Sequence, residues 1–84
     1  MRIAILDDDP RQSELAGKIL GTTGHACHPF ASGRDMLQQL RREDYDMLIL
    51  DWQMTDRSSP AVLCWAREKM PPKLPVLITI GSAG

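Results

Sequence analysis

The chain of 84 residues is long enough for one small domain, and its 43% of hydrophobic residues can form a modest core. Ten basic and eleven acidic residues leave a formal net charge of −1, which excludes the strongly basic surface typical of proteins that bind nucleic acids or anionic membranes. No apolar run approaches the roughly 20 residues of a membrane-spanning helix, and residue 1 leads into a strand pattern without a secretory signal. With only two cysteines, the sequence predicts one cytoplasmic domain over residues 1–84, without direct membrane or nucleic-acid contacts.

The first two elements are a strand and a helix. Residues 2–6 form a short apolar run, which predicts a strand, and Asp9 before Pro10 is a typical helix start. The helix would extend to about residue 20, where glycines end it. Its expected inner face consists of Leu15, Ala16, Ile19 and Leu20.

The middle of the chain repeats this order. Residues 25–30 predict a second strand, and Ser32 with Asp35 three residues later resembles a capping box that opens a second helix. Residues 47–51 are apolar on both faces, which is typical of a parallel strand covered on both sides.

The last part of the chain predicts one more helix and one more strand. Ser59 before Pro60 again indicates a helix start, and residues 75–80 are a final apolar run. Four strands that alternate with three helices imply right-handed β-α-β units and a parallel sheet, so the predicted fold class is α/β.

Acidic residues close two of the predicted strands. Asp7 and Asp8 follow the first, and Asp51 ends the third. In open parallel sheets, ligands bind beyond the carboxyl ends of the strands, so these three carboxylates should converge if the two strands are neighbours. Their repulsion requires either a protonated carboxyl group or a cation, and an all-oxygen site of few ligands favours Mg²⁺. Such a pocket suits phosphoryl transfer, with aspartate as a possible nucleophile. Asp9 is interpreted only as the helix cap.

The segment "ILDDDP", followed by "YDMLILDWQMT", resembles the receiver domain of bacterial two-component response regulators. The resemblance implies a flavodoxin-like three-layer fold with strand order 2-1-3-4 and a phosphoryl group received on Asp51 from a sensor histidine kinase. It also implies a Mg²⁺ site in which Asp8 binds the ion directly, Asp7 acts largely through water, and Gln53 offers its backbone carbonyl. The domain would be a signalling switch that phosphorylates and dephosphorylates itself, and not an enzyme.

A hydroxyl at the end of the fourth strand is also implied by the resemblance. Thr79 has a suitable distance from Asp51 along the pattern, but counting from Pro75 places the usual position at Ile80, and Ser82 is a third candidate. The three alternatives remain open from the sequence.

The sequence departs from the family pattern in two regions. Thr55 and Ser59 occupy the positions four and eight residues after Asp51, where the family usually has proline and glycine. The family's fourth helix, fifth strand, fifth helix and phosphate-binding lysine have no counterpart in these residues. We therefore expect the sequence to be a piece of a longer protein; the alternative is that another chain, such as a second copy pairing or exchanging strands, covers the exposed fourth strand.

Two other functions are alternatives. A degenerate receiver would serve only as a protein-interaction module; the substituted loop favours this and the intact acidic triad opposes it. The segment "DWQMT" also resembles the DxDxT signature of haloacid dehalogenase-like phosphatases, but Gln53 replaces the second aspartate, which removes the general acid/base.

Overall fold

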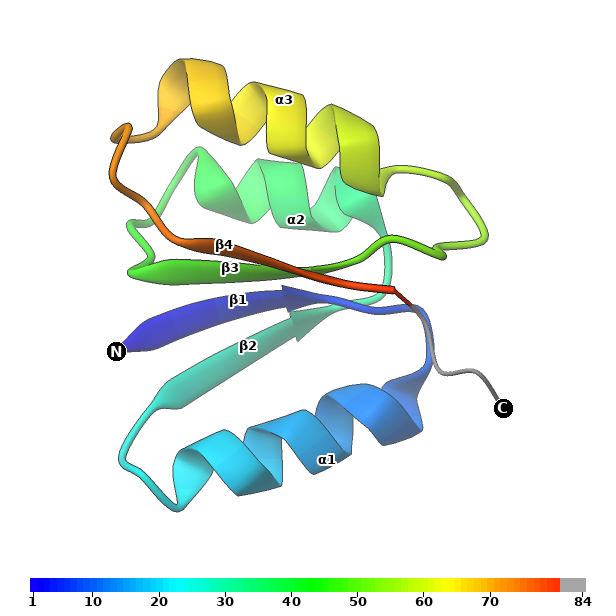
Figure 1. Ribbon diagram of the computed structural model, residues 1–84, viewed down its shortest axis with the longest axis vertical. Helices are drawn as coiled ribbons and strands as arrows, with labels where there is room; N and C mark the ends of the chain where they lie inside the picture. Colours follow the sequence, from blue (N-terminus) through cyan, green and yellow to red (C-terminus); the bar gives the residue numbers. More distant parts are fainter. Residues whose placement is uncertain (81–84) are drawn as a thin grey trace.

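The computed structural model describes residues 1–80, which form a parallel sheet of four strands with helices on both faces (Figure 1). The elements in chain order are β1 (Arg2–Leu6), α1 (Pro10–Gly21), β2 (Ala26–Phe30), α2 (Gly33–Leu40), β3 (Met47–Asp51), α3 (Ser59–Lys69) and β4 (Val76–Thr79). The strand order is β2-β1-β3-β4. The α/β class and the 2-1-3-4 order predicted from the sequence are confirmed. None of the helices within the described range has the length and apolarity to cross a membrane.

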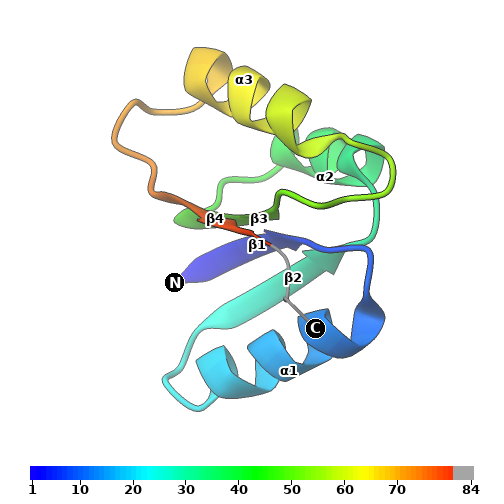
Figure 2. The ribbon, with the colours of Figure 1, turned by 45° about the vertical axis from the view of Figure 1, so that its right-hand side comes forward.

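The helices form two unequal layers. Helices α2 and α3 lie side by side on one face of the sheet, and α1 lies alone on the other (Figures 1 and 2). Because side chains alternate along a strand, Ala4 and Leu6 of β1 point to the α2–α3 face and are fully buried. The main cluster of buried residues is Ala4, Leu6, Met36, Leu40, Tyr45, Leu48, Leu50, Met54, Val62, Ala66 and Leu74.

Helix α1 buries a different stripe from the one predicted. Leu15 and Ile19 are each 59% exposed, whereas Ser13 is buried and Ala16 and Leu20 are half-buried. The helix packs chiefly against β2 at the side of the sheet, so only a narrow face of it meets the strands. Leu15 and Ile19 lie one turn apart beside that face, and their prediction as core residues was wrong.

Strand β3 is fully covered on one face only. Leu48 and Leu50 are completely buried under α2 and α3, but Met47 and Ile49 on the opposite face are half-buried. Within residues 1–80, α1 is the one helix on that face, and it lies over β2. The expectation of a strand covered on both sides is therefore met fully on the α2–α3 face and only in part on the other.

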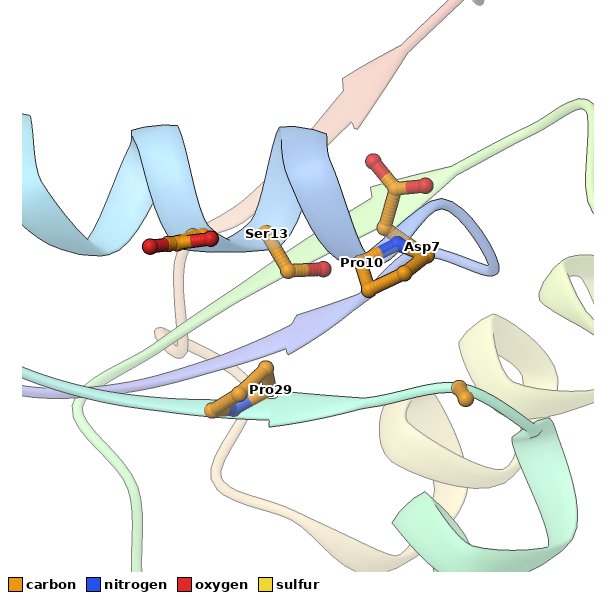
Figure 3. Close-up of a pocket in the computed structure, with 6 residues that line it drawn as sticks. Asp7, Pro10, Ser13 and Pro29 are labelled. Carbon is orange, nitrogen blue, oxygen red and sulfur yellow. The ribbon is translucent and has the colours of Figure 1, made fainter.

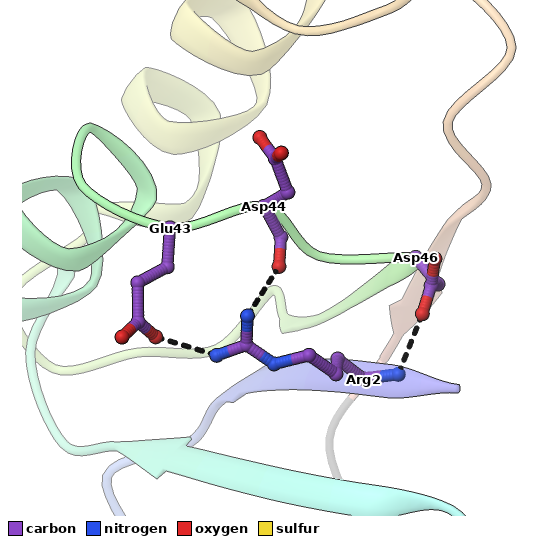
Figure 4. A network of polar contacts seen from close by, with 4 residues as sticks. All are labelled: Arg2, Glu43, Asp44 and Asp46. Carbon is purple, nitrogen blue, oxygen red and sulfur yellow. Dashed lines mark hydrogen bonds and ion pairs between the residues drawn. The ribbon is translucent and has the colours of Figure 1, made fainter.

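A polar network joins the amino-terminal ends of β1 and β3 (Figure 4). The Arg2 guanidinium donates to the Glu43 carboxylate and to the Asp44 carbonyl, while the backbone N–H of Arg2 donates to Asp46 Oδ2 at 2.7 Å. The Asp46 N–H in turn donates to the Arg2 carbonyl at 2.8 Å. These bonds tie the start of β1 to the segment that leads into β3, and so help to set the register in which the two strands reach the opposite edge together.

The two outer strands differ in how they meet solvent. In β2, Ala26 donates its N–H to the Met1 carbonyl just before β1, and the Phe30 carbonyl accepts the Asp7 N–H just after it. Because alternate residues of a parallel strand bond to the same side, the backbone of Pro29 points to the outer edge. Proline has no N–H, and Pro29 therefore removes a donor from the outer edge of β2. In β4, the Pro75 and Thr79 carbonyls face β3. The backbone of Ile78, which alternates with them, therefore points to the outer edge of the sheet, and it includes an N–H. Its neighbour Leu77 is 48% exposed and Ile78 itself 42%.

Candidate functional site

Three carboxylates meet at the carboxyl ends of β1 and β3. One oxygen from each of Asp7, Asp8 and Asp51 lies within 4.8 Å of the others. Strands β1 and β3 are direct neighbours, with Leu6 opposite Leu50, so Asp7 and Asp51 end adjacent strands at the same height. The sheet therefore brings these three residues together, as predicted.

Local backbone bonds hold the first two aspartates in place. The Asp7 N–H donates to the Phe30 carbonyl at 3.0 Å, which continues the pairing of β1 with β2 one residue beyond the strand. The Asp7 side chain accepts the Asp9 N–H at 2.9 Å. Asp9 has an extended backbone and its own carboxylate accepts the Arg11 N–H, as predicted for the cap of α1.

Asp51 is buried, with 8% of its surface exposed, and its Oδ1 accepts the Gln53 N–H at 3.0 Å. The fully buried Ser59 donates its hydroxyl to the Asp51 carbonyl. Ser59 was predicted to be the cap of α3, but it is the first helical residue, preceded by Ser58 at the cap position. Its hydroxyl thus ties the start of α3 to the end of β3.

The loop between β3 and α3 also contacts Asp8. Thr55 donates both its N–H, at 2.9 Å, and its hydroxyl, at 2.8 Å, to Asp8 Oδ2. Sequence reasoning had treated Thr55 only as a departure from a turn pattern and missed this role. The contact joins residues 47 positions apart, so no local sequence signal could show it.

The site shifts the pKa values of two of its aspartates in opposite directions. Burial, and then the nearby charges of Asp51 and Asp8, raise the pKa of Asp7, although the Asp9 N–H opposes this. The two bonds from Thr55 lower the pKa of Asp8. In residues 1–80, no lysine or arginine forms an ion pair with Asp7, Asp8 or Asp51. The cluster is therefore an uncompensated concentration of negative charge.

The sequence matches the response regulator receiver domain over residues 3–83. The chain belongs to this family. No curated protein matches the sequence significantly.

Solved structures of receiver domains share the fold. The chemotaxis response regulator CheY4 of Vibrio cholerae has a TM-score of 0.87 at 18% identity over 99% of this chain and 70% of its own. A chain in the complex of histidine kinase ThkA with response regulator protein TrrA has a TM-score of 0.81 at 27% identity, over 92% of this chain and 66% of its own. TrrA from Thermotoga maritima in complex with Mg²⁺-BeF has a TM-score of 0.78 at 22% identity, over 94% and 86%. The receiver domain described here thus spans about two thirds of the first two matched chains.

The receiver domain has the donor set for a small, hard cation. Carboxylate oxygens, unpaired with any basic side chain of residues 1–80, are the ligands that Mg²⁺ prefers. Gln53 lies in the turn directly after Asp51, which keeps its backbone beside the cluster. The residues present therefore fit a magnesium site.

Of the three positions considered for the hydroxyl, Thr79 is the one that the sheet pairs directly with Asp51. The two residues are paired across β3 and β4, and the Thr79 carbonyl accepts the Trp52 N–H at 2.9 Å. The Thr79 hydroxyl lies 3.5 Å from the Leu50 carbonyl, to which it donates. Ile80 follows with 78% of its surface exposed, and Ser82 lies outside the described residues.

An apolar hollow of about 460 Å³ opens beside the acidic cluster of the receiver domain (Figure 3). Pro10 and Ser13 of α1 lie on one side of it and Pro29 of β2 on the other, with Asp7 at its end. The hollow therefore joins the surface of α1 to the edge of the sheet where the carboxylates meet.

Replacing Asp7 by asparagine should stabilise the metal-free domain at pH 7. Because the pKa of Asp7 is raised in the folded chain, its contribution favours folding below the unfolded pKa and is lost as the pH rises through the folded value. Solvent screens this half-buried group, so we expect less than about 1 kcal/mol, or an increase in Tm of less than roughly 4–8 °C. Thermal unfolding in EDTA at pH 7 and at about pH 3.5 measures the gain, which should shrink at the lower pH.

Asp44→Asn is the matched control for Asp7→Asn, because it also removes one negative charge but lies far from the cluster. Its Tm should change less than that of Asp7→Asn. An equal gain in the two variants would show that net charge, and not the environment of Asp7, is responsible.

Proposed function

We propose that this receiver domain is a phosphorylation switch in which Asp51 accepts a phosphoryl group from a sensor histidine kinase, with Mg²⁺ as cofactor. The observation that carries the proposal is the convergence of Asp7, Asp8 and Asp51 within 4.8 Å, without a basic partner in the described chain. Asp8 and Asp51 would hold the ion directly, together with the Gln53 carbonyl, and Asp7 would act largely through water. The bound ion would supply charge neutralisation for the phosphoryl oxygens.

The chemistry assigned to Asp51 is a single displacement. Its free carboxylate oxygen attacks the phosphorus of a phosphohistidine, an O–P bond forms, and the N–P bond breaks with the electron pair returning to the imidazole. The Gln53 N–H holds Asp51 Oδ1, which fixes the orientation of the carboxylate during the attack. The resulting acyl phosphate hydrolyses on the same domain, so we assign self-modification and no turnover of a free substrate.

Thr79 is the proposed sensor of the phosphoryl group. Within residues 1–80 its hydroxyl makes one long bond, to the Leu50 carbonyl, and its position opposite Asp51 in the sheet would let it exchange that bond for a phosphoryl oxygen. A new bond there would move the end of β4 and bias a two-state surface.

The hollow beside α1 is the proposed contact for the kinase. It is lined by Pro10, Pro29 and Ala31 and ends at Asp7, so an apolar side chain seated in it would bring its own helix next to the acidic cluster. The structure of histidine kinase ThkA in complex with TrrA supports this class of partner. A cytoplasmic location follows from the proposed partner.

The test is the incubation of the purified chain with Mg²⁺ and a small acyl phosphate. We expect the intact mass to rise by one phosphoryl group, the adduct to be removed by hydroxylamine as an acyl phosphate is, and EDTA to prevent its formation. No adduct would contradict the proposal and favour the degenerate interaction module. Continuous release of phosphate from diverse phosphate monoesters would instead favour the phosphatase.

We also propose that the 84-residue chain pairs with a second copy through the outer edge of β4. Ile78 presents an outward N–H and carbonyl, and the apolar surfaces of Leu77 and Ile78 are each more than two fifths exposed. Antiparallel pairing of two β4 strands would satisfy these backbone groups and bury the same residues from both copies.

Light scattering during size-exclusion chromatography tests this pairing. The wild-type chain should be dimeric at high concentration and Ile78→Lys monomeric, because a charge would be buried in the paired edge. Leu15→Lys is the control, since Leu15 is also an exposed apolar residue but lies on α1. Loss of the dimer in both variants would contradict pairing through β4.

A further inference from the structure

We infer that Thr55 is a positioning residue for the cation site: it fixes the Asp8 carboxylate next to Asp7 and Asp51 and thereby raises the affinity of the receiver domain for Mg²⁺. This inference rests on the proposed function, because it assumes that Asp8 is a magnesium ligand. Thr55 occupies the position where the family pattern has proline, a residue that can offer neither the N–H nor the hydroxyl used here.

The geometry leaves Asp8 free to bind an ion while Thr55 holds it. Both Thr55 donors, at 2.9 and 2.8 Å, converge on the single oxygen Oδ2. An ionised carboxylate offers about four acceptor positions, so roughly half remain for other partners. In this same conformation an Asp8 oxygen lies within 4.8 Å of oxygens of Asp7 and Asp51. Thr55 therefore acts on the orientation of Asp8 without occupying the site.

Thr55 is itself held by its neighbours in the loop. Met54 before it is buried in the main core, and the Arg57 N–H closes a turn on the Met54 carbonyl at 3.0 Å. Asp56 after it accepts the Gly33 N–H through Oδ2, and the Ser58 N–H and hydroxyl through Oδ1. A donor pair anchored in this way can hold the half-buried Asp8 side chain to one rotamer.

The effect on Mg²⁺ follows from what Asp8 would do without these bonds. Asp7, Asp8 and Asp51 repel one another, and Asp8 is the least buried of the three in the cluster. Without the bonds from Thr55, the Asp8 carboxylate would turn toward solvent. Part of the binding free energy of the ion would then be needed to return it to the site. Residues that orient metal ligands typically change metal affinity by about 10- to 100-fold when they are replaced.

Isothermal titration of the chain with MgCl₂ tests the inference. We expect Thr55→Val, which keeps the shape and the N–H but loses the hydroxyl, to raise the Kd for Mg²⁺ by about 10-fold, and Thr55→Ser to stay within about 2-fold of the wild type. Thr22→Val is the matched control, because it removes a hydroxyl that donates to the Ile19 carbonyl on α1 at 2.7 Å, far from the cluster. It should leave the Kd unchanged.

The outcomes separate the inference from the proposed function. If the wild type binds Mg²⁺ and Thr55→Val binds equally well or more tightly, Thr55 does not position Asp8 and the inference fails alone. If the wild type does not bind Mg²⁺, the proposed cofactor fails and the inference fails with it. Thermal unfolding in EDTA, and Thr55→Ala as a second variant, distinguish a lost ligand orientation from a lost fold: the Kd should change in both variants while the Tm changes little, because Thr55 is exposed.

Discussion

Asp51→Asn should abolish the formation of the phosphoryl adduct. The amide has no anionic oxygen to attack phosphorus, and the site loses one of its three negative charges. The fold should survive, because an amide oxygen can still accept the Gln53 N–H in place of Asp51 Oδ1. Intact-mass measurement after incubation with Mg²⁺ and an acyl phosphate should show complete loss of the adduct, with an unchanged far-ultraviolet circular dichroism spectrum.

Asp9→Asn is the matched control for this variant. Asp9 belongs to the same run of aspartates, but its carboxylate caps α1 by accepting the Arg11 N–H, and asparagine caps helices about as well as aspartate. We expect Asp9→Asn to form the adduct at a rate close to that of the wild type. An adduct on Asp51→Asn would show that another residue accepts the phosphoryl group, and peptide mapping would identify it.

Gly33→Ala should cause a large loss of stability. A Cβ atom built on Gly33, the first residue of α2, would lie 2.3 Å from Ser58 Cβ and 2.4 Å from Ser58 Oγ. Ser58 cannot move aside easily, because its N–H and hydroxyl are both bonded to Asp56. Overpacking of this kind costs about 1–3 kcal/mol, and each kcal/mol should lower the Tm of a chain of this size by roughly 4–8 °C.

Gly17→Ala is the opposite case and serves as the control. Gly17 lies inside α1, and a Cβ atom there would have no neighbour within 4 Å. Alanine should therefore stabilise the helix by up to about 1 kcal/mol. Thermal and urea unfolding of the two variants measures both effects. Equal Tm values for Gly33→Ala and the wild type would show that the loop before α3 can shift away from α2 at little cost.

The fold and the acidic cluster were predictable from the sequence because they depend on local patterns of apolar and acidic residues, and not on how side chains pack between elements. A buried strand that ends at a carboxylate places that carboxylate at the sheet edge, whatever packs around it, and this applies to both Asp7 and Asp51. The packing of α1 was not predictable in the same way. Leu15 and Ile19 have the right spacing for a core face, but the position of α1 over β2 buries Ser13 in their place.

Contacts between loops that are far apart in the sequence could not be predicted from the sequence. Thr55 was predicted only as a departure from a turn pattern, and Ser59 as such a departure and as a helix cap. Both hydroxyls instead bond to residues at or just after the ends of strands, Thr55 to the Asp8 carboxylate and Ser59 to the Asp51 carbonyl. Each bond depends on where the loop after β3 lies relative to its neighbours. A hydroxyl at those positions indicates polarity, and only the folded chain shows the acceptor.

The proline in β2 sets a limit on assembly. Pro29 removes a hydrogen-bond donor from one outer edge of the sheet, whereas the Ile78 N–H remains on the other. In the proposed pairing, each copy would add a neighbour at β4, while the donor missing at Pro29 disfavours extension of the resulting sheet at β2. If β4 pairs as proposed, strand pairing would favour two copies over a continuous sheet, and association should saturate as the protein concentration rises.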